Sequence, residues 1–380
     1  MLRATHSTRL AALACLAALG ATWTIAAADS PPLPDAPRRD VDLVIALDVS
    51  GSMEGLIESA KQRLWDITNE LAQARPVPAL RVAILSYGRP SYGEQSGYVR
   101  VDLPFTADLD AVNATLFAFQ TDGGDEYVAR AIQTSLDTLQ WSQDPNALQI
   151  VFVAGNESAD QDPLLTTQGA TALAAHRGIV VNTLYCGSDN DGDAPGWRRV
   201  ALNTNGMYAS IDQNAAAVAN VATPFDAELA VLDDELNGTY IAFGSAGEAG
   251  RANQVAQDGN AVAMSPAAAA SRTVAKAGVL YRSEWDVVDA VESGKALADI
   301  PVAELPAEMQ ALDPAEREAY VRDKAERRDE VQRQIGGLAA ERSRYIADQT
   351  TESTATGLDT AILEGIREVA ATKGFSFPAE

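Results

Sequence analysis

The sequence predicts a doubly wound α/β sheet of mostly parallel strands with one antiparallel edge strand, followed by a mainly α-helical C-terminal region. Between residues 41 and 225, short apolar runs alternate with amphipathic stretches, which is typical of parallel strands covered by helices on both faces. Residues 98–105 instead alternate apolar and polar side chains and so predict the antiparallel edge strand. From residue 226 the sequence becomes Ala-rich and charged, with helical spacing.

The predicted elements of residues 41–225 follow the order strand, helix, strand, strand, helix, helix, strand, helix, strand, helix, strand, helix. The first strand, Asp42–Leu47, is an almost unbroken apolar run. The first helix, Met53–Ala74, has apolar side chains at helical spacing and ends before the prolines of residues 75–78. The remaining strands are 80–88, 98–105, 148–155, 178–187 and 206–211, and the remaining helices are 108–119, 127–139, 164–176, 197–204 and 214–223.

The first 28 residues have the features of an export signal. Arg3 and Arg9 precede the apolar stretch Leu10–Ile25, and small residues offer a cleavage site after Ala28. Residues 29–40 are rich in proline and predict an extended tether. We therefore expect an exported protein, periplasmic or secreted, with no transmembrane span once the signal is removed.

The charge of the chain limits the partners that we expect, and its cysteine content limits the disulfides. The formal net charge is −24, which repels nucleic acid and anionic lipid and favours divalent cations. Removal of the leader would leave Cys186 as the only cysteine, so no intramolecular disulfide is expected.

The clearest helical pattern of the C-terminal region is Pro314–Asp348. It predicts a long helix that is broken or bent near Gly336 and Gly337. One interpretation is a solvated helical hairpin, and the other is a coiled coil that binds a partner or forms oligomers. Its apolar residues among dense charge are Tyr320, Ala325, Val331, Ile335, Leu338 and Tyr345.

Oxygen-bearing side chains cluster where several predicted strands end. Asp48, Ser50 and Ser52 stand at alternate positions directly after the first strand. Asn156 and Glu157 follow the strand 148–155, and the loop TDGGDE, residues 121–126, opens a helix that can turn toward the same edge. Asp, Ser and Gly are also the usual residues of turns, which is the simpler interpretation of these loops. The number of oxygen-rich loops at one edge of the sheet instead favours a site for a hard cation such as Mg²⁺, Mn²⁺ or Ca²⁺.

The stretch DVSGS, residues 48–52, with the apolar strand before it and the amphipathic helix after it, resembles the D-x-S-x-S signature of the von Willebrand factor type A domain. The element order is also similar to that family, and we assign residues 41–225 to such a domain and 226–380 to a helical region. The resemblance implies a metal-ion-dependent adhesion site, in which Asp48, Ser50 and Ser52 hold the ion.

The resemblance also implies a Thr from a later loop and an Asp after the fourth strand, and this sequence departs from the family at both positions. Asp125 follows the Gly-Gly pair where that Thr is expected, and Gly155 stands where the Asp is expected. Asn156 or Glu157 would then complete the site, or water would. The residue pattern of these loops resembles that of a subgroup of exported bacterial proteins with a helical C-terminal part.

The function implied is non-enzymatic binding of a protein partner that offers an acidic side chain to the metal. A metal-free scaffold with the same fold is the alternative. A Mg²⁺-dependent phosphohydrolase of the haloacid-dehalogenase type would need a second carboxylate two residues after Asp48, where Ser50 stands. Asp189, Asp191 and Asp193 suggest a calcium loop, but the glycine and the closing glutamate of that motif are misplaced or missing. His176 stands at a predicted helix end and is not expected to be catalytic.

Overall fold

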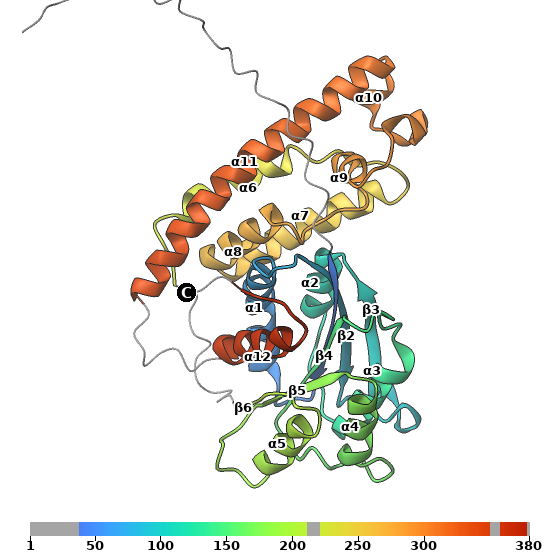
Figure 1. Cartoon of the computed structure of the whole chain (residues 1–380), viewed down its shortest axis with the longest axis vertical. Helices are drawn as coiled ribbons and strands as arrows, with labels where there is room; N and C mark the ends of the chain where they lie inside the picture. The colour runs from blue at the N-terminus through green and yellow to red at the C-terminus, as the bar shows by residue number, and fades with distance from the viewer. Residues whose placement is uncertain (1–37, 211–220, 350–357, 378–380) are drawn as a thin grey trace, which may run out of the picture. The chain divides into compact units, whose positions relative to one another are not determined.

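A computed structural model of the chain describes residues 38–210, 221–349 and 358–377. Six strands form one sheet in the order β3-β2-β1-β4-β5-β6 (Figure 1). Every neighbouring pair is parallel except β2 and β3, which pair antiparallel at the edge. The strands are β1 (Arg39–Asp48), β2 (Pro78–Tyr87), β3 (Val99–Thr106), β4 (Leu148–Gly155), β5 (Val180–Tyr185) and β6 (Tyr208–Ser210). The predicted mostly parallel sheet with one antiparallel edge strand is confirmed.

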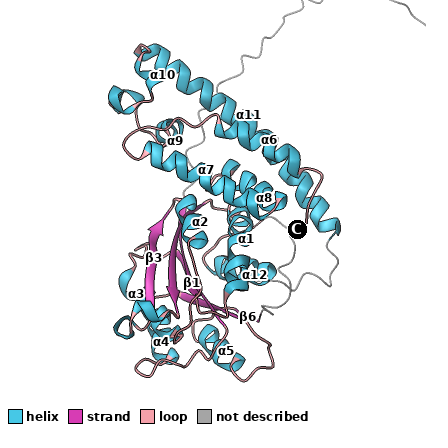
Figure 2. Ribbon diagram, turned by 180° about the vertical axis from the view of Figure 1, so that it is seen from behind, coloured by secondary structure: helices cyan, strands magenta, loops and turns pink. Residues whose placement is uncertain are grey.

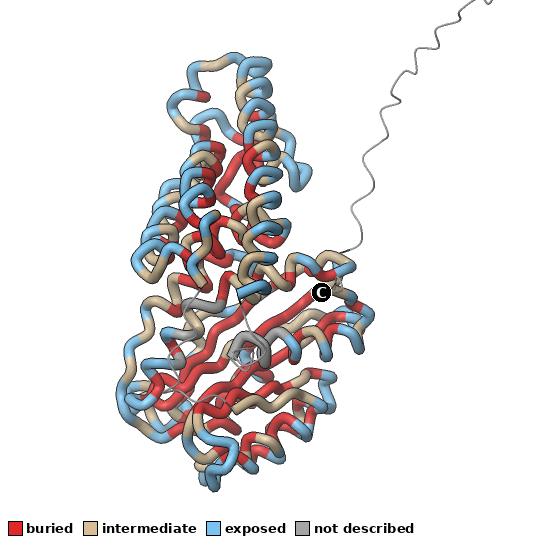
Figure 3. Tube along the Cα trace, turned by 90° about the vertical axis from the view of Figure 1, so that its left-hand side faces the viewer, coloured by how far each residue is buried: buried red, intermediate tan, exposed pale blue. Residues whose placement is uncertain are grey.

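Helices cover both faces of this sheet, as Figure 2 shows from behind. In β1, Val41, Leu43 and Leu47 lie in the core under α1 and α2, while Val44 and Ala46 lie in the opposite core under α3, α4 and α5. Alternate residues of a strand point to opposite faces, so an unbroken apolar run fills both cores. Figure 3 shows the central strands coloured as buried along most of their length. These helices are α1 (Glu54–Leu71), α2 (Leu109–Phe117), α3 (Val128–Thr138), α4 (Thr167–His176) and α5 (Ala194–Leu202).

The order of elements through β6 follows the sequence prediction, with boundaries that shift by a few residues. The first strand begins at Arg39, inside the range expected as tether. The 3₁₀ turns Pro90–Tyr92 and Glu94–Ser96 lie in the loop between β2 and β3. The predicted export signal lies outside the described residues, and so does most of the helix expected at 214–223. Among the residues described, no helix is both long and apolar enough to cross a bilayer.

The region after residue 225 is helical. Its α-helices are α6 (Asp226–Asn237), α7 (Gly247–Met264), α8 (Pro266–Ala277), α9 (Val287–Glu292), α10 (Ala307–Gln310) and α11 (Pro314–Gln349), with 3₁₀ turns at Leu297–Asp299 and Val302–Glu304.

The break expected near Gly336 and Gly337 does not occur, because α11 runs as one helix through both glycines. Apart from the helix's own backbone and the chain neighbours, nothing lies within 4 Å of the Cβ position of either glycine. The apolar side chains of α11 pack within this chain instead of forming a hairpin. Val331 and Ile335 are buried in a cluster with residues of α6 and α8, and Tyr345 packs edge-to-face on Phe225.

The last helix, α12 (Leu358–Thr372), returns to the sheet. Ile366, Val369 and Ala370 are buried in the same core as the residues of α1 and α2, and α12 lies beside α1 (Figure 1). After it, Ser376 forms an isolated antiparallel bridge with Arg75. In the structure the helices α6–α11 are therefore inserted between the last strand and the last helix of the sheet-containing part.

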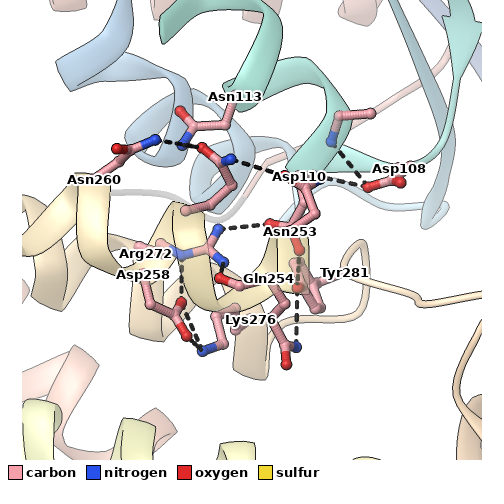
Figure 4. Close-up of polar contacts among 12 residues, drawn as sticks. Asp108, Asp110, Asn113, Asn253, Gln254, Asp258, Asn260, Arg272, Lys276 and Tyr281 are labelled. Atoms are coloured by element: carbon pink, nitrogen blue, oxygen red, sulfur yellow. Dashed lines mark hydrogen bonds and ion pairs between the residues drawn. The ribbon is translucent and has the colours of Figure 1, made fainter. Parts of the chain in front are cut away.

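A buried polar network joins this insertion to the sheet-containing part (Figure 4). The guanidinium of Arg272 in α8 donates to Asp110 of α2 at 2.7 Å and to Asp258 of α7 at 2.6 Å. The Tyr281 hydroxyl donates to the other oxygen of Asp110 at 2.5 Å. Lys276 lies beside Arg272 and donates to both oxygens of Asp258 at 2.9 and 3.0 Å. Each buried charge of this network therefore has an oppositely charged partner.

Candidate functional site

The loop after β1 brings four oxygen-bearing side chains together at the carboxyl edge of the sheet. The Ser50 amide donates to Asp48 Oδ1 at 2.7 Å. The hydroxyls of Ser50 and Ser52 lie 3.1 Å apart, and the Ser52 hydroxyl donates to Asn156 Oδ1 at 3.1 Å. Asp48 and Ser50 are buried, and Ser52 is exposed. The structure therefore assembles four of the six side chains that the sequence singled out.

Backbone hydrogen bonds hold this loop between its neighbours. The Val49 amide donates to the carbonyl of Tyr87 at the end of β2, at 2.9 Å. The Val49 carbonyl accepts from the amide of Asp122, at 3.0 Å, in the loop that leads into α3. These two bonds tie the backbone between Asp48 and Ser50 to the end of β2 and to the loop that leads into α3.

Glu126 is the carboxylate that reaches Asp48, and sequence reasoning missed it. Glu126 is 4% exposed and Asp48 is fully buried. Asp48 Oδ2 is buried and has no donor among the described residues unless Glu126 carries a proton. Burial, the hydrogen bond with Asp48 and the negative charge of Asp48 raise the pKa of Glu126 to about 9. Burial also raises the pKa of Asp48. Two adjoining buried carboxylates need a proton or a cation between them.

The donor set suits a hard cation. Asp48, Ser50, Ser52, Glu126 and Asn156 offer only oxygen, three of them from neutral groups, which matches the preference of Mg²⁺ and Mn²⁺. Within the described part of the chain, no group of three or more Asp, Glu, His or Cys side chains converges on a metal position. A site of this composition therefore depends on hydroxyl and amide oxygens beside its two carboxylates.

Asp125 and Glu157 lie at the rim and not at the centre. Asp125 is exposed and lies beside the hydroxyls of Tyr98 and Tyr127. Glu157 is exposed, and its Oε2 accepts from the Gln161 side chain at 2.7 Å. Asp125 and Glu126 are adjacent in the chain, so their side chains point to different sides of the loop, and only one of them reaches Asp48. The sequence shows the acidic pair Asp125 and Glu126 in TDGGDE, but it does not show which of the two side chains turns toward Asp48.

Gly88 makes the close approach of these loops possible. Its φ is +89°, and a Cβ there would lie 2.8 Å from Asp48 Oδ1 and 3.3 Å from Glu126 Cγ. A side chain at this position would meet both a strained backbone and the carboxylate pair.

We expect Gly88→Ala to lower the free energy of unfolding by about 2–4 kcal/mol, from backbone strain and overpacking together. Gly178→Ala is the matched control, since Gly178 also has a positive φ, of +74°, but nothing lies within 4 Å of its Cβ position. The control should cost about 1 kcal/mol in urea denaturation. Equal losses for the two variants would contradict the close packing at Gly88.

The other candidates from the sequence do not join this site. Asp189 accepts from the Tyr208 hydroxyl at 2.8 Å and pairs with Arg198, whereas Asp191 accepts from the Ser188 amide at 2.8 Å. The two carboxylates thus have separate partners, and Asp193 is exposed. His176 is exposed at the end of α4, four residues before β5 begins, which places it at the opposite edge of the sheet.

Comparison with known proteins agrees with this description. Residues 43–157 match the family model of the von Willebrand factor type A domain. No curated protein matches the chain. Proximal thread matrix protein 1 from the mussel byssus, with a zinc-occupied MIDAS motif, is 10% identical with a TM-score of 0.36, covering 46% of this chain and 41% of that one. The chain thus spans less than half of that matrix protein.

Two further solved structures match this chain with similarly low sequence identity and TM-score. The SpRpn10 VWA domain is 11% identical with a TM-score of 0.33, and the match covers 45% of this chain and 87% of that domain. The pilus adhesin SpaC from Lactobacillus rhamnosus GG, in its open conformation, is 17% identical with a TM-score of 0.36, and the match covers 47% of this chain and 29% of the adhesin.

Proposed function

We propose that this chain, which carries a von Willebrand factor type A domain, is an exported, non-enzymatic binding protein that uses a divalent cation to hold an acidic side chain of a protein partner. The cation is Mg²⁺ or Mn²⁺, with Ca²⁺ as a further possibility. Asp48, Ser50, Ser52, Glu126 and Asn156 would hold it, directly or through water. The predicted leader of residues 1–28 supports export.

One observation supports the metal most strongly: the buried carboxylates of Asp48 and Glu126 adjoin each other, and Asp48 Oδ2 has no donor among the residues that the structure describes. At neutral pH this arrangement is stable only with a shared proton or a bound cation. The hydroxyls of Ser50 and Ser52, 3.1 Å apart, and the Asn156 amide oxygen, 3.1 Å from Ser52, offer further oxygens. When bound, the cation would act as a Lewis acid with an open position for a partner carboxylate.

The residues of the chain contribute in different ways. Asp48 Oδ1 accepts from the Ser50 amide, and the Asp48 carboxylate lies beside that of Glu126. Ser52 and Asn156 hold each other at the mouth of the site. Because Glu126 adds a second carboxylate, it lowers the net positive charge that a bound ion offers to a partner, and we expect moderate affinity for the partner. A metal-free scaffold is the second candidate, in which the pair holds a proton instead of a cation.

Calorimetric titration of the chain without its leader, with Mg²⁺ and with Mn²⁺, tests the proposal. Asp48→Asn keeps an acceptor for the Ser50 amide but removes the charge, and it should weaken binding by about 100-fold or more. Asp191→Asn, an exposed acid at the same edge, should bind as the wild type does. Absence of binding by the wild type, or equal binding by Asp48→Asn, would contradict the metal site and leave the scaffold.

A further inference from the structure

An open cavity of about 630 Å³ lies between the helices α6, α7 and α8 of the inserted region. Residues of all three helices line it, among them the buried Arg272 of α8. None of its lining residues belongs to the proposed metal site, which lies at the edge of the sheet. Small-molecule sites in proteins measure about 300–1,000 Å³. The cavity is therefore large enough for a small molecule, and its charges indicate which kind.

Most of the acids and bases at this cavity are already paired with one another. Lys276, whose side chain is fully buried, donates to Asp233 Oδ1 and to Asp258 Oδ1, each at 2.9 Å. Arg272 also pairs with Asp258, at 2.6 Å (Figure 4). These charged groups have partners within the chain, so none of them needs a ligand.

Two lining charges of opposite sign have no ion pair within the part of the chain that the structure describes. Asp234 of α6 is exposed, and its carboxylate accepts no hydrogen bond from any described residue. Arg251 of α7 donates through Nη1 alone, to the Asn237 carbonyl at 2.7 Å and to Gln254 Oε1 at 3.0 Å. These bonds hold the guanidinium in place and leave Nε and Nη2, the pair of donors that matches a carboxylate.

The two charges are anchored close together. Asp234 precedes Asn237 by about one turn of α6, and the Arg251 guanidinium lies against the Asn237 carbonyl. Their points of attachment on α6 are therefore roughly 5 Å apart along the helix. An α-amino acid or a short peptide carries an ammonium and a carboxylate over a comparable distance. A molecule of this kind can pair with both residues at once.

The lining away from Arg251 is apolar. Ala230 lies about two turns before Asn237 on α6, and Val262 lies about three turns after Arg251 on α7. Val262 is 66% exposed, so it offers apolar surface that a ligand can cover. The cavity therefore combines an apolar end with one free acid and one free base.

We propose that this cavity binds a small zwitterion with an aliphatic side chain, either a free amino acid or a short peptide. Its carboxylate pairs with Arg251, its ammonium pairs with Asp234, and its aliphatic group lies against Ala230 and Val262. A carboxylic acid without the ammonium meets the unpaired charge of Asp234, and an amine without the carboxylate leaves Arg251 unpaired. The inference goes beyond the proposed function, because it involves neither the metal nor the protein partner.

Calorimetric titration of the full chain in EDTA, with leucine and with leucyl-leucine, tests the site. We expect saturable binding, and the tighter of the two ligands shows whether the source is a free amino acid or a peptide. Isocaproate keeps the carboxylate and the aliphatic chain of leucine but lacks the ammonium, and isoamylamine lacks the carboxylate. Isocaproate should bind about threefold weaker or less, and isoamylamine about tenfold weaker or less, than the zwitterion.

Gly259→Leu blocks the cavity without removing a charge. Gly259 lines the cavity, and nothing outside its own helix and its chain neighbours lies within 4 Å of its Cβ position. Because leucine favours helix over glycine, the variant should be at least as resistant to urea as the wild type, yet it should bind leucine at least tenfold more weakly. Gly336→Leu is the matched control, since Gly336 of α11 also has an open Cβ position but does not line the cavity.

The charges are tested by Arg251→Gln and Asp234→Asn, which should weaken leucine binding by about tenfold and threefold. Glu228→Gln, an exposed acid of α6 outside the cavity, should bind as the wild type does. Absence of saturable binding by both zwitterions, equal binding of leucine and isocaproate, or wild-type binding by Gly259→Leu would each overturn the site. Because these titrations contain no divalent cation, their outcome does not affect the proposed metal site.

Discussion

Replacing Arg272 by methionine should lower the free energy of unfolding by about 3–5 kcal/mol, the largest effect on stability that we expect from one substitution. Arg272 is 1% exposed and pairs with Asp110 and Asp258, and its guanidinium lies 4.7 Å from the centre of the Trp65 ring. Methionine would fill much of the space but would leave Asp110 with only the Tyr281 hydroxyl as a donor. A buried carboxylate that has lost its charged partner is costly.

Urea denaturation of the wild type and the variant measures this loss. Arg333→Met is the control, because Arg333 is exposed and pairs with Glu330 one helical turn away on the surface of α11. That exchange should change stability by less than about 0.5 kcal/mol. The double variant Arg272→Met with Asp110→Leu should regain part of the loss, since it removes the unpaired carboxylate as well. A loss below about 1 kcal/mol for Arg272→Met would contradict the role of this network in joining the insertion to the sheet.

Replacing Glu126 by glutamine should change how the stability of the metal-free chain depends on pH. The pKa of Glu126 is raised from its ordinary value near 4.5 to about 9, so between these values the folded chain holds a proton that the unfolded chain has released. This contribution to stability is complete below pH 4.5 and is lost as pH rises toward 9. The fall in stability from pH 6 to pH 8 should therefore be about 2 kcal/mol smaller in Glu126→Gln.

The proton held by Glu126 should also affect the affinity of the chain for Mg²⁺. A cation at the proposed site must displace it, so the affinity of the wild type for Mg²⁺ should rise with pH over the range 6 to 8, whereas any remaining affinity of Glu126→Gln should not. Thermal or urea unfolding in EDTA isolates the metal-free effect, and Glu157→Gln is the control, since Glu157 is exposed. Identical pH profiles for wild type and Glu126→Gln would show that the carboxylate pair does not share a proton.

Local patterns in the sequence predicted the sheet well, because the signals for its elements are local. The apolar run that became β1 and the alternation that became β3 depend on side chains only a few positions apart. The Gly-Gly pair of TDGGDE also marked the right loop. The loop that turns Glu126 inward and Asp125 outward packs its Gly124 closely against the Gly88 carbonyl, a contact between distant segments. The sequence pattern does not contain that contact.

The C-terminal region shows the same limit. Its helical character and the helix Pro314–Asp348 were predicted from spacing, but the other helices and the surfaces on which they pack were not. The apolar residues of α11 left open a solvated hairpin or a coiled coil with a partner, whereas Val331 and Ile335 pack on α6 and α8 of this chain. The return of α12 to the sheet depends on where Ile366 and Val369 find an apolar surface, which no local pattern encodes. Gly336 and Gly337 suggested a break, but the helical hydrogen bonds around them continue.

The return of α12 has a consequence for the order in which the chain is made. The six strands are synthesised first, then the inserted helices, and α12 after both. Until residues 364–377 are complete, the apolar surface of α1 and the sheet that Ile366 and Val369 cover stays open to solvent. Incomplete chains therefore expose an apolar surface, which favours chaperone binding or aggregation.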